Sequence, residues 1–400
     1  MKFLILGGGT AGSVAAFEIR KQDKDAQITI LEASDKVAHA QCSMPYLIEG
    51  YFEDCDELLV YDKKTFEDAG IKFVFNAPVK EIGKDYVKYG KDGEENFDKL
   101  IIATGVEPKI PPIKNLENYL TFKSLEDAKA VQESLNNEKK YSIIGAGLIG
   151  VELAYALRKK GKEVKIIEAQ DEILSAVLSK NMARKIEKML VGEGIEISKS
   201  TLVEDASELE GQVIVSSGVE LGFDYSKFGL EVNHGIVVDN KMQTNMENIY
   251  AIGDCAEFRD YGSTQLGSCA VKQARILANN FYNEPIEFFT TTPAVSRLGD
   301  VVFGSAGSKE GMAVSYKSKE NHLTEDKINV MLHVGDDGKV LGGEVIGGED
   351  VAARINMISL AIQKGVTVWD LSELSTCYNP SISEIFDPLV VAAQLAVKRL

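Results

Sequence analysis

The stretch from Lys2 to Gly12, KFLILGGGTAG, decides the fold. Its first five residues predict a short apolar strand, Ser13 to Lys21 a helix, and Gln27 to Glu32 a second strand. Between the first strand and the helix, GGGTAG satisfies the pattern G-x-G-x-x-G. Glycines in that place allow a tight turn and bring backbone amides and a helix N-terminus close to a pyrophosphate. The sequence therefore predicts a βαβ unit that binds a dinucleotide.

The same order of elements returns in the second hundred residues. Tyr141 to Ile144 predicts a strand, GAGLIG at Gly145 to Gly150 a glycine turn, Val151 to Lys160 a helix, and Glu163 to Glu168 another strand. Two such units predict two Rossmann-like nucleotide-binding domains in an α/β fold.

Each unit ends in an acidic residue, Glu32 in the first and Glu168 in the second. A carboxylate there can accept hydrogen bonds from ribose hydroxyls, and Glu168 would repel a 2′-phosphate, so we expect NADH rather than NADPH in the second unit. The alternative is that Glu168 only caps the end of its strand. The residues predicted to bind the first cofactor are Gly7, Gly9, Thr10, Ala11, Gly12 and Glu32, and those for the second are Gly145, Gly147, Ile149, Gly150 and Glu168.

Composition excludes several classes of function. The chain has 400 residues, 44% of them apolar, which favours two or three domains. A net charge of -17 opposes nucleic-acid binding. No apolar run reaches the roughly 18 residues of a membrane-spanning helix, and the chain enters a strand at once, so we expect a cytoplasmic enzyme without membrane contact. The five cysteines match no zinc pattern, and no metal site is expected.

Changes of pattern mark the domain borders. Glu107-Pro108 and the run Ile110-Pro111-Pro112 suit a crossing between domains better than the interior of a sheet. From about Thr290 alternating strands (328–334 and 340–346) precede two helices (350–364 and 387–400), which predicts a separate α+β domain.

Two fingerprints followed by TNMENIYAIGD at Thr244 to Asp254 resemble the pyridine nucleotide-disulfide oxidoreductase family over essentially the whole chain. The resemblance implies that FAD binds the first fingerprint, and that Glu152 lies near nicotinamide and flavin. Further FAD contacts are implied for Ala103, Thr104, Gly105, Gly253 and Asp254. It also implies an FAD domain (1–112 and 244–288) that holds an inserted NAD(P)H domain (113–243), a C-terminal dimerisation domain (289–400), and a homodimer.

Cys42 points to one branch of this family. Members with a redox disulfide carry C-x-x-x-x-C, whereas QCSMPY at Gln41 to Tyr46 offers one sulfur, and the next cysteine, Cys55, lies in an acidic stretch. The segment resembles the single-cysteine branch of coenzyme A-disulfide reductases, NADH oxidases, NADH peroxidases and polysulfide or persulfide reductases. The implied chemistry is attack by a Cys42 thiolate on a disulfide, persulfide or polysulfide substrate. The alternative is that Cys42 is a small thiol packed in the protein core, without a catalytic role.

Other residues help to distinguish the members of this branch from one another. Oxidases and peroxidases resemble one another in a His within the first glycine turn, where this chain has Thr10. A Tyr-x-Pro segment of coenzyme A-disulfide reductases resembles Tyr378-Asn379-Pro380 and implies Tyr378 as the acid that protonates a leaving thiolate, or else an interface aromatic. A second Tyr of those reductases has no counterpart in Lys319 to His322.

Five further residues are weaker candidates. Arg20, Lys63 and Lys64 could meet the phosphates of coenzyme A, His39 could perturb the thiolate, and Cys377 could act as a resolving thiol. A packed His and solvated surface charges are the competing explanations. Two other functions stay open, an NADH oxidase that reduces oxygen and a flavin electron-transfer or redox-sensing protein.

Overall fold

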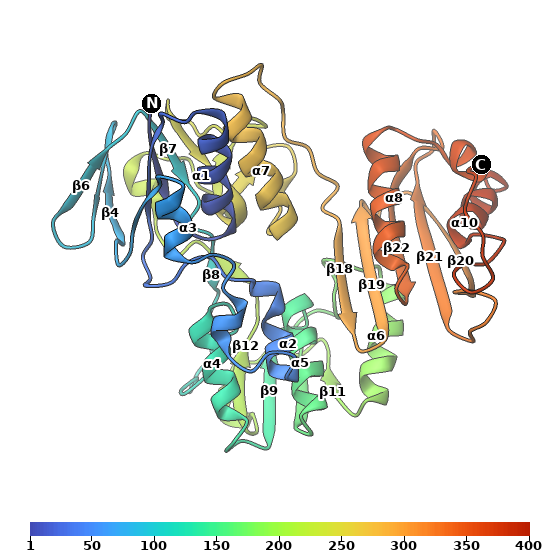
Figure 1. The fold of residues 1–400 in the computed structure, drawn as a ribbon. Coiled ribbons are helices and arrows are strands. Elements are labelled where there is room, and N and C mark those ends of the chain that lie inside the picture. Colours follow the sequence, from blue (N-terminus) through green and yellow to red (C-terminus); the bar gives the residue numbers. More distant parts are fainter. The chain divides into compact units, whose positions relative to one another are not determined.

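The computed structural model describes residues 1–400 and has a mixed α/β architecture with six β-sheets (Figure 1). Contacts group the chain into two compact units. The first unit comprises Met1–Ile110, Thr121–Glu133 and Gly218–Phe289, and the second comprises Pro111–Leu120, Ser134–Ser217 and Thr290–Leu400.

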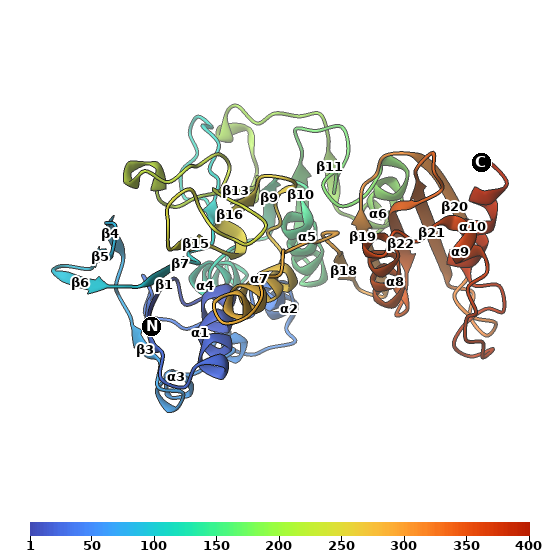
Figure 2. The same ribbon diagram turned by 90° about the horizontal axis from the view of Figure 1, so that it is seen from above.

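A parallel five-stranded sheet organises the first unit. Its strand order is β15-β7-β1-β2-β3. The strands are β1 (Lys2–Leu6), β2 (Gln27–Leu31), β3 (Lys72–Val74), β7 (Lys99–Ile102) and β15 (Ile249–Ala251). Helix α1 (Thr10–Gln22) connects β1 to β2 and packs beside α7 (Gly267–Asn280), as Figure 2 shows. Strands β1, β2 and β7 are almost entirely apolar and buried, as expected for a parallel sheet covered on both faces.

Smaller elements complete the first unit. They are an antiparallel sheet of β4 (Val79–Ile82), β5 (Tyr86–Tyr89) and β6 (Gly93–Asn96), a sheet of β14 (Ile236–Val238), β16 (Ala256–Phe258) and β17 (Gly262–Ser263), and a pair of β8 (Glu107–Pro108) with β13 (Val219–Glu220). The remaining helices are α2 (Met44–Glu49), α3 (Lys63–Asp68) and most of α4 (Leu125–Ser134).

The second unit opens with a parallel four-stranded sheet of order β11-β10-β9-β12. Its strands are β9 (Lys140–Ile144), β10 (Glu163–Ile167), β11 (Glu196–Ser198) and β12 (Gln212–Val215). Helix α5 (Leu148–Lys159) connects β9 to β10, and α6 (Lys180–Gly192) connects β10 to β11. This is the second βαβ unit that the sequence predicts.

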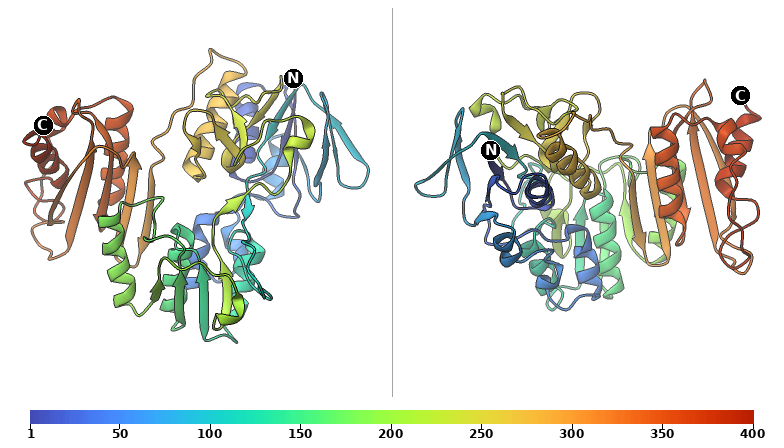
Figure 3. Two further views of the ribbon diagram at one scale, coloured as in Figure 1. Left: turned by 180° about the vertical axis from the view of Figure 1, so that it is seen from behind. Right: turned by 45° about the horizontal axis from the view of Figure 1, so that its top comes forward.

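An antiparallel five-stranded sheet carries the C-terminal part of the same unit. Its order is β18-β19-β22-β21-β20, with β18 (Ala294–Leu298), β19 (Val301–Gly307), β20 (Met312–Lys319), β21 (Lys327–Val334) and β22 (Val340–Gly347). Helix α8 (Val351–Gln363) packs on β19 and β22, and α10 (Pro388–Val397) packs on β20 and β21 beside α9 (Val368–Ser372). Figure 3 shows these elements from orange to red. The predicted fold class, two Rossmann-like units with a C-terminal α+β part, is confirmed.

Two details differ from the expectations or stay open. Helices α1 and α5 begin at Thr10 and Leu148, three residues earlier than the sequence predicts, because Gly9 and Gly147 are extended and the helical turn starts directly after them. The four domain segments stay a prediction, since the compact units group the second nucleotide-binding sheet with the C-terminal sheet.

The last helix buries Leu389, Ala392, Ala393 and Ala396 within its own subunit, so core packing accounts for its apolar side. No helix in the structure has both the length and the apolar character required to cross a bilayer.

Candidate cofactor and thiol site

The first glycine turn has the shape that its sequence predicts. Gly7 adopts φ +98°, and a Cβ there would lie 2.4 Å from the carbonyl oxygen of Ala103. A Cβ on Gly12 would lie 2.0 Å from the carbonyl oxygen of Gly7, so the third glycine lets helix α1 pack against the turn. At Gly9 no atom lies within 4 Å of a Cβ. The turn is therefore closed on its protein side and open where a pyrophosphate would approach.

The second glycine turn repeats this geometry in the other unit. Gly145 adopts φ +108°, and a Cβ there would lie 2.2 Å from the carbonyl oxygen of Ser216. A Cβ on Gly150 would lie 2.2 Å from the carbonyl oxygen of Gly145, whereas Gly147 has open space. Helices α1 and α5 both start without a side-chain cap and without an acidic residue in the first turn. Their first amides and positive dipole ends are thus available to an anion.

The two acids hold the turns by accepting hydrogen bonds from backbone amides. Glu32 accepts hydrogen bonds from the amides of Gly8 (2.7 Å) and Ser34 (2.9 Å). Glu168 accepts from the amides of Ala146 (2.7 Å) and Gln170 (2.8 Å). A carboxylate has about four lone-pair sites, so each acid retains acceptor capacity for ribose hydroxyls. Both turns and both acids therefore fit a dinucleotide.

Asp254 lies beside the first turn and has a partner that sequence reasoning missed. Gly253 donates its amide to Gln273 Oε1 (2.6 Å), and a Cβ on Gly253 would lie 2.9 Å from the Cβ of Ala11 in α1. Asp254 Oδ2 is 3.2 Å from Lys123 Nζ, in an ion pair whose side chains are about one-fifth exposed. The pair places a cation next to Asp254, one of the predicted flavin-binding residues.

The Ala103-Thr104-Gly105 segment is also held by a residue far away in sequence. The hydroxyls of Thr104 and Tyr225 are 2.7 Å apart, and burial raises the pKa of Tyr225 well above its usual range. Tyr225 thus stays a phenol that can hydrogen-bond Thr104. Lys123 and Tyr225 carry no local motif, so only the tertiary structure could identify them.

Cys42 is exposed on a short, well-anchored segment. It lies in a 3-10 turn, Gln41–Ser43, which continues into α2, where Met44 and Pro45 are buried. Pro45 stands in the first turn of that helix, where its missing amide hydrogen costs nothing. The buried-thiol alternative is wrong for Cys42, whereas Cys255 and Cys269 are buried.

Cys55 and His39 lie on either side of Cys42 in the sequence, and Cys55 forms no disulfide with it. Cys55 is a thiol whose pKa is raised, first by burial and then by the Asp54 carboxylate, so it forms thiolate less readily. Burial lowers the pKa of His39, and its Nε2 is buried without a hydrogen-bond partner. His39 is therefore a packed, neutral imidazole at pH 7.

In the second unit, Glu152 of α5 accepts a hydrogen bond from Ser296 Oγ of β18 (2.5 Å). Ser296 is buried, so this contact fixes the carboxylate of Glu152 from the side of the C-terminal sheet. The Ser is another contact that the sequence alone did not indicate.

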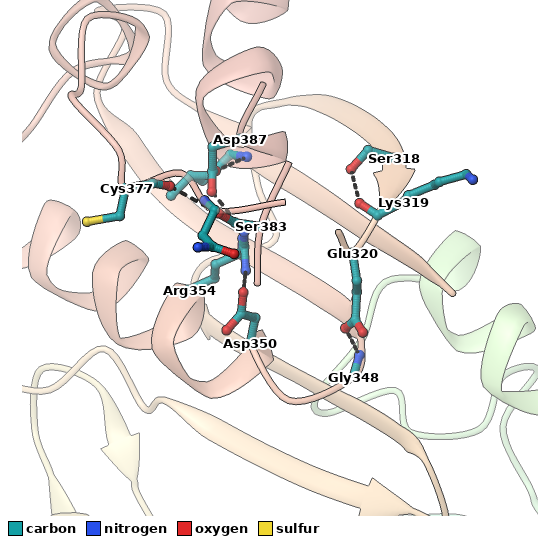
Figure 4. Close-up of polar contacts among 11 residues, drawn as sticks. Ser318, Lys319, Glu320, Gly348, Asp350, Arg354, Cys377, Ser383 and Asp387 are labelled. Atoms are coloured by element: carbon teal, nitrogen blue, oxygen red, sulfur yellow. Dashed lines mark hydrogen bonds and ion pairs between the residues drawn. The ribbon is translucent and has the colours of Figure 1, made fainter. Parts of the chain in front are cut away.

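The segment that carries Cys377 and Tyr378 is exposed but fixed at its ends (Figure 4). Ser383 Oγ donates to the carbonyl oxygen of Cys377 (3.1 Å), and the Cys377 sulfur points away from this contact. Asp387, which caps α10, pairs with the buried Arg354 at 2.8 Å. Tyr378 is 51% exposed, so its phenol is accessible to a ligand or a second subunit.

The cations considered for coenzyme A have other partners. Arg20 donates all five of its N–H groups to backbone carbonyls, those of Asp23, Lys24, Ala26, Ala69 and Gly70. Lys63 and Lys64 form exposed i,i+4 ion pairs with Glu67 and Asp68. Arg20 is thus a structural residue, and the two lysines show no arrangement specific to a phosphate.

Two dinucleotide-shaped turns and an exposed cysteine on a fixed turn define an oxidoreductase of the flavin and nicotinamide class. Residues 1–274 match the family model described as pyridine nucleotide-disulphide oxidoreductase, and residues 306–390 match the dimerisation domain of that family. The chain belongs to this family.

Its relatives include proteins with sulfur and oxygen chemistry in their names. It is 32% identical to an NADH oxidase of Methanocaldococcus jannaschii over 100% of this chain and 99% of that protein. It is 28% identical to an NAD(P)H coenzyme A polysulfide/persulfide reductase of Pyrococcus horikoshii over 98% of both chains. Among solved structures, an NAD-dependent persulfide reductase from A. fulgidus aligns with a TM-score of 0.94 at 30% identity, covering 100% of this chain and 83% of that one.

Proposed function

We propose that the protein is an FAD-dependent NADH oxidoreductase that reduces a small disulfide, persulfide or polysulfide through Cys42. The observation that carries this proposal is the exposed Cys42 on a fixed turn in a chain with two dinucleotide-shaped glycine turns. The named relatives, two of which are persulfide reductases, support the substrate class.

The chain's residues divide the work between two cofactors. Gly7, Gly9, Thr10, Ala11, Gly12 and Glu32 hold FAD, together with Ala103, Thr104, Gly105, Gly253 and Asp254. Gly145, Gly147, Ile149, Gly150, Glu152 and Glu168 hold NADH. When bound, NADH would supply a hydride, and FAD would supply the redox chemistry that connects this hydride to the reduction of sulfur.

Cys42 performs the sulfur chemistry. Its thiolate attacks one sulfur of R-S-S-R, the S–S bond breaks, and R-S⁻ leaves while Cys42 becomes a mixed disulfide. Two electrons, the number carried by one NADH, then release the second thiol and restore the thiolate. One cysteine is sufficient because the substrate brings the partner sulfur.

We propose a homodimer with a cytoplasmic location. The match to the family's dimerisation domain supports the dimer. So does the segment after α9, where Tyr378, Ile382, Ile385 and Phe386 are between 51% and 71% exposed. Apolar side chains gathered in this way are typical of an interface. The location rests on the sequence alone.

Anaerobic NADH oxidation tests the proposed function. Coenzyme A disulfide, other small disulfides, a persulfide and polysulfide are compared as acceptors, and oxygen uptake is measured separately. We expect turnover with at least one sulfur acceptor in the absence of oxygen. An enzyme that oxidises no NADH with these acceptors anaerobically but consumes oxygen rapidly would instead be an oxidase, the activity in the M. jannaschii relative's name. Absence of NADH oxidation with both the sulfur acceptors and oxygen would favour an electron-transfer protein.

Tyr378 is proposed as the acid that protonates the leaving thiolate. Replacing it by Phe is expected to lower kcat for disulfides by about 10² to 10⁴-fold, the usual contribution of general acid catalysis. Oxygen-dependent NADH oxidation should not change, since no thiolate leaves. Phe in place of the exposed Tyr119 serves as the matched control. Equal loss of both activities in Tyr378→Phe would indicate an interface role only.

A further inference from the structure

The end of the second nucleotide-binding sheet brings Glu168 beside a lysine that the sequence did not single out. Ile167 of β10 is in register with Ser198 of β11. The Glu168 amide donates to the carbonyl oxygen of Ser198 (2.8 Å), and the Thr201 amide donates to that of Glu168 (2.9 Å). Lys199, which follows Ser198, therefore leaves the sheet at the same carboxyl edge as Glu168. In doubly wound sheets the cofactor binds along this edge, with its adenosine ribose at the acid.

Lys199 is held by two carboxylates. Its Nζ is 3.1 Å from Glu172 Oε2 and 2.8 Å from Glu187 Oε2. Lys199 and Glu187 are each 22% exposed, and Glu172 is 8% exposed. Burial alone would raise the pKa of Glu172, but the ion pairs with Lys180 and Lys199 outweigh it and the pKa is lowered. Hydrogen bonding to Glu187 raises the pKa of Lys199, so the lysine is charged at pH 7.

The cations close to Lys199 also form ion pairs with carboxylates. Lys180 pairs with Asp171 (2.9 Å) and Glu172 (3.0 Å), and Arg184 lies 3.4 Å from Glu172. Three cations thus face three carboxylates, and Glu168 adds a further negative charge to this edge. Lys180, Arg184 and Lys199 are each paired with a carboxylate, so none of these three is free to balance a second phosphate on the ribose.

We propose that Glu172 and Glu187 determine specificity for the nicotinamide cofactor by holding Lys199 away from the 2′-position of the adenosine ribose. Glu168 repels a 2′-phosphate, and these two carboxylates neutralise the lysine that could otherwise bind it. Removing Glu187 leaves Lys199 only Glu172, which Lys180 and Arg184 also contact, so the lysine is held less firmly and can bind a phosphate. The inference rests on the proposed function, in which the second glycine turn binds NADH.

Glu187 is the residue to change. It lies on the helix α6 and is partly exposed, so Ala at this position keeps the helix and removes both the charge and the acceptor. Glu172 is buried among three cations, and its loss would endanger folding. One charged hydrogen bond to a phosphate corresponds to a gain of about tenfold or more in affinity.

The test measures adenosine 2′,5′-bisphosphate and 5′-AMP binding to the FAD-loaded enzyme by calorimetry, beside kcat/KM for NADPH and NADH. In the wild type we expect NADH to be favoured and the bisphosphate to bind no better than 5′-AMP. Glu187→Ala should strengthen bisphosphate binding about tenfold and leave 5′-AMP unchanged. Adding Lys199→Met should remove the gain. Glu193→Ala, which deletes the exposed partner of Lys159, is the matched control.

The outcomes separate the two claims. If Glu187→Ala binds 5′-AMP normally but gains no affinity for the bisphosphate, the inference is overturned. It is also overturned if the gain persists without Lys199 or appears equally in Glu193→Ala. If the wild type binds neither 5′-AMP nor NADH, the proposed function fails instead.

Discussion

Replacing Cys42 by Ser is expected to lower NADH oxidation with disulfide, persulfide or polysulfide acceptors by at least about 10³-fold, because a serine hydroxyl cannot form the mixed disulfide. Cys42 is exposed, so the substitution removes no core packing. The variant should bind FAD as tightly as the wild type, and NADH should still bleach its flavin absorbance under anaerobic conditions. Steady-state turnover and single-turnover flavin reduction, measured on the same preparation, separate these steps.

Two other cysteines provide controls for that variant. Cys55 lies in the acidic stretch and has a raised thiol pKa, so Cys55→Ser should retain wild-type turnover. Cys377→Ala should also retain it if the substrate supplies the second sulfur. A Cys377→Ala enzyme that stalls with a mixed disulfide on Cys42 would establish a resolving thiol. Sulfur-dependent turnover that survives Cys42→Ser would refute the proposed role of Cys42.

The fold and the shape of both glycine turns could be predicted because their sequence pattern is local. A strand, a glycine turn, a helix and an acid follow one another within about 30 residues in a βαβ unit. Gly12 faces the carbonyl oxygen of Gly7 in the same βαβ unit, so the sequence pattern records this steric requirement directly.

The residues that were missed act over long separations in sequence. Lys123 reaches Asp254, Tyr225 reaches Thr104, and neither carries a motif. Lys199 was missed for a similar reason, since its place beside Glu168 follows from the register of two strands. For Arg20 the error is the opposite, because its position in the sequence suggests a cation that is available to a ligand. It stands at the end of the first helix, but its guanidinium is fully used by backbone carbonyls of the following loops. A cation's availability depends on its partners, which one sequence does not show.

A side chain introduced into one glycine turn should abolish binding of the cofactor at that turn without affecting the other turn. Gly12→Val places side-chain atoms where a Cβ already lies 2.0 Å from the carbonyl oxygen of Gly7, so α1 must move away from β1. We expect a colourless protein whose affinity for FAD falls by at least about 100-fold, equivalent to about 2.7 kcal/mol, and no activity with any acceptor.

Gly150→Val makes the corresponding clash, 2.2 Å from the carbonyl oxygen of Gly145, in the other compact unit. We expect this protein to remain yellow with FAD bound, while NADH no longer reduces the flavin at concentrations that saturate the wild type. Dithionite should still reduce it, because that reagent bypasses the second turn. The assignment of FAD to the first turn and NADH to the second requires this asymmetry. Loss of FAD from Gly150→Val, in a protein whose circular dichroism is unchanged, would show that the two sites had been assigned to the wrong cofactors.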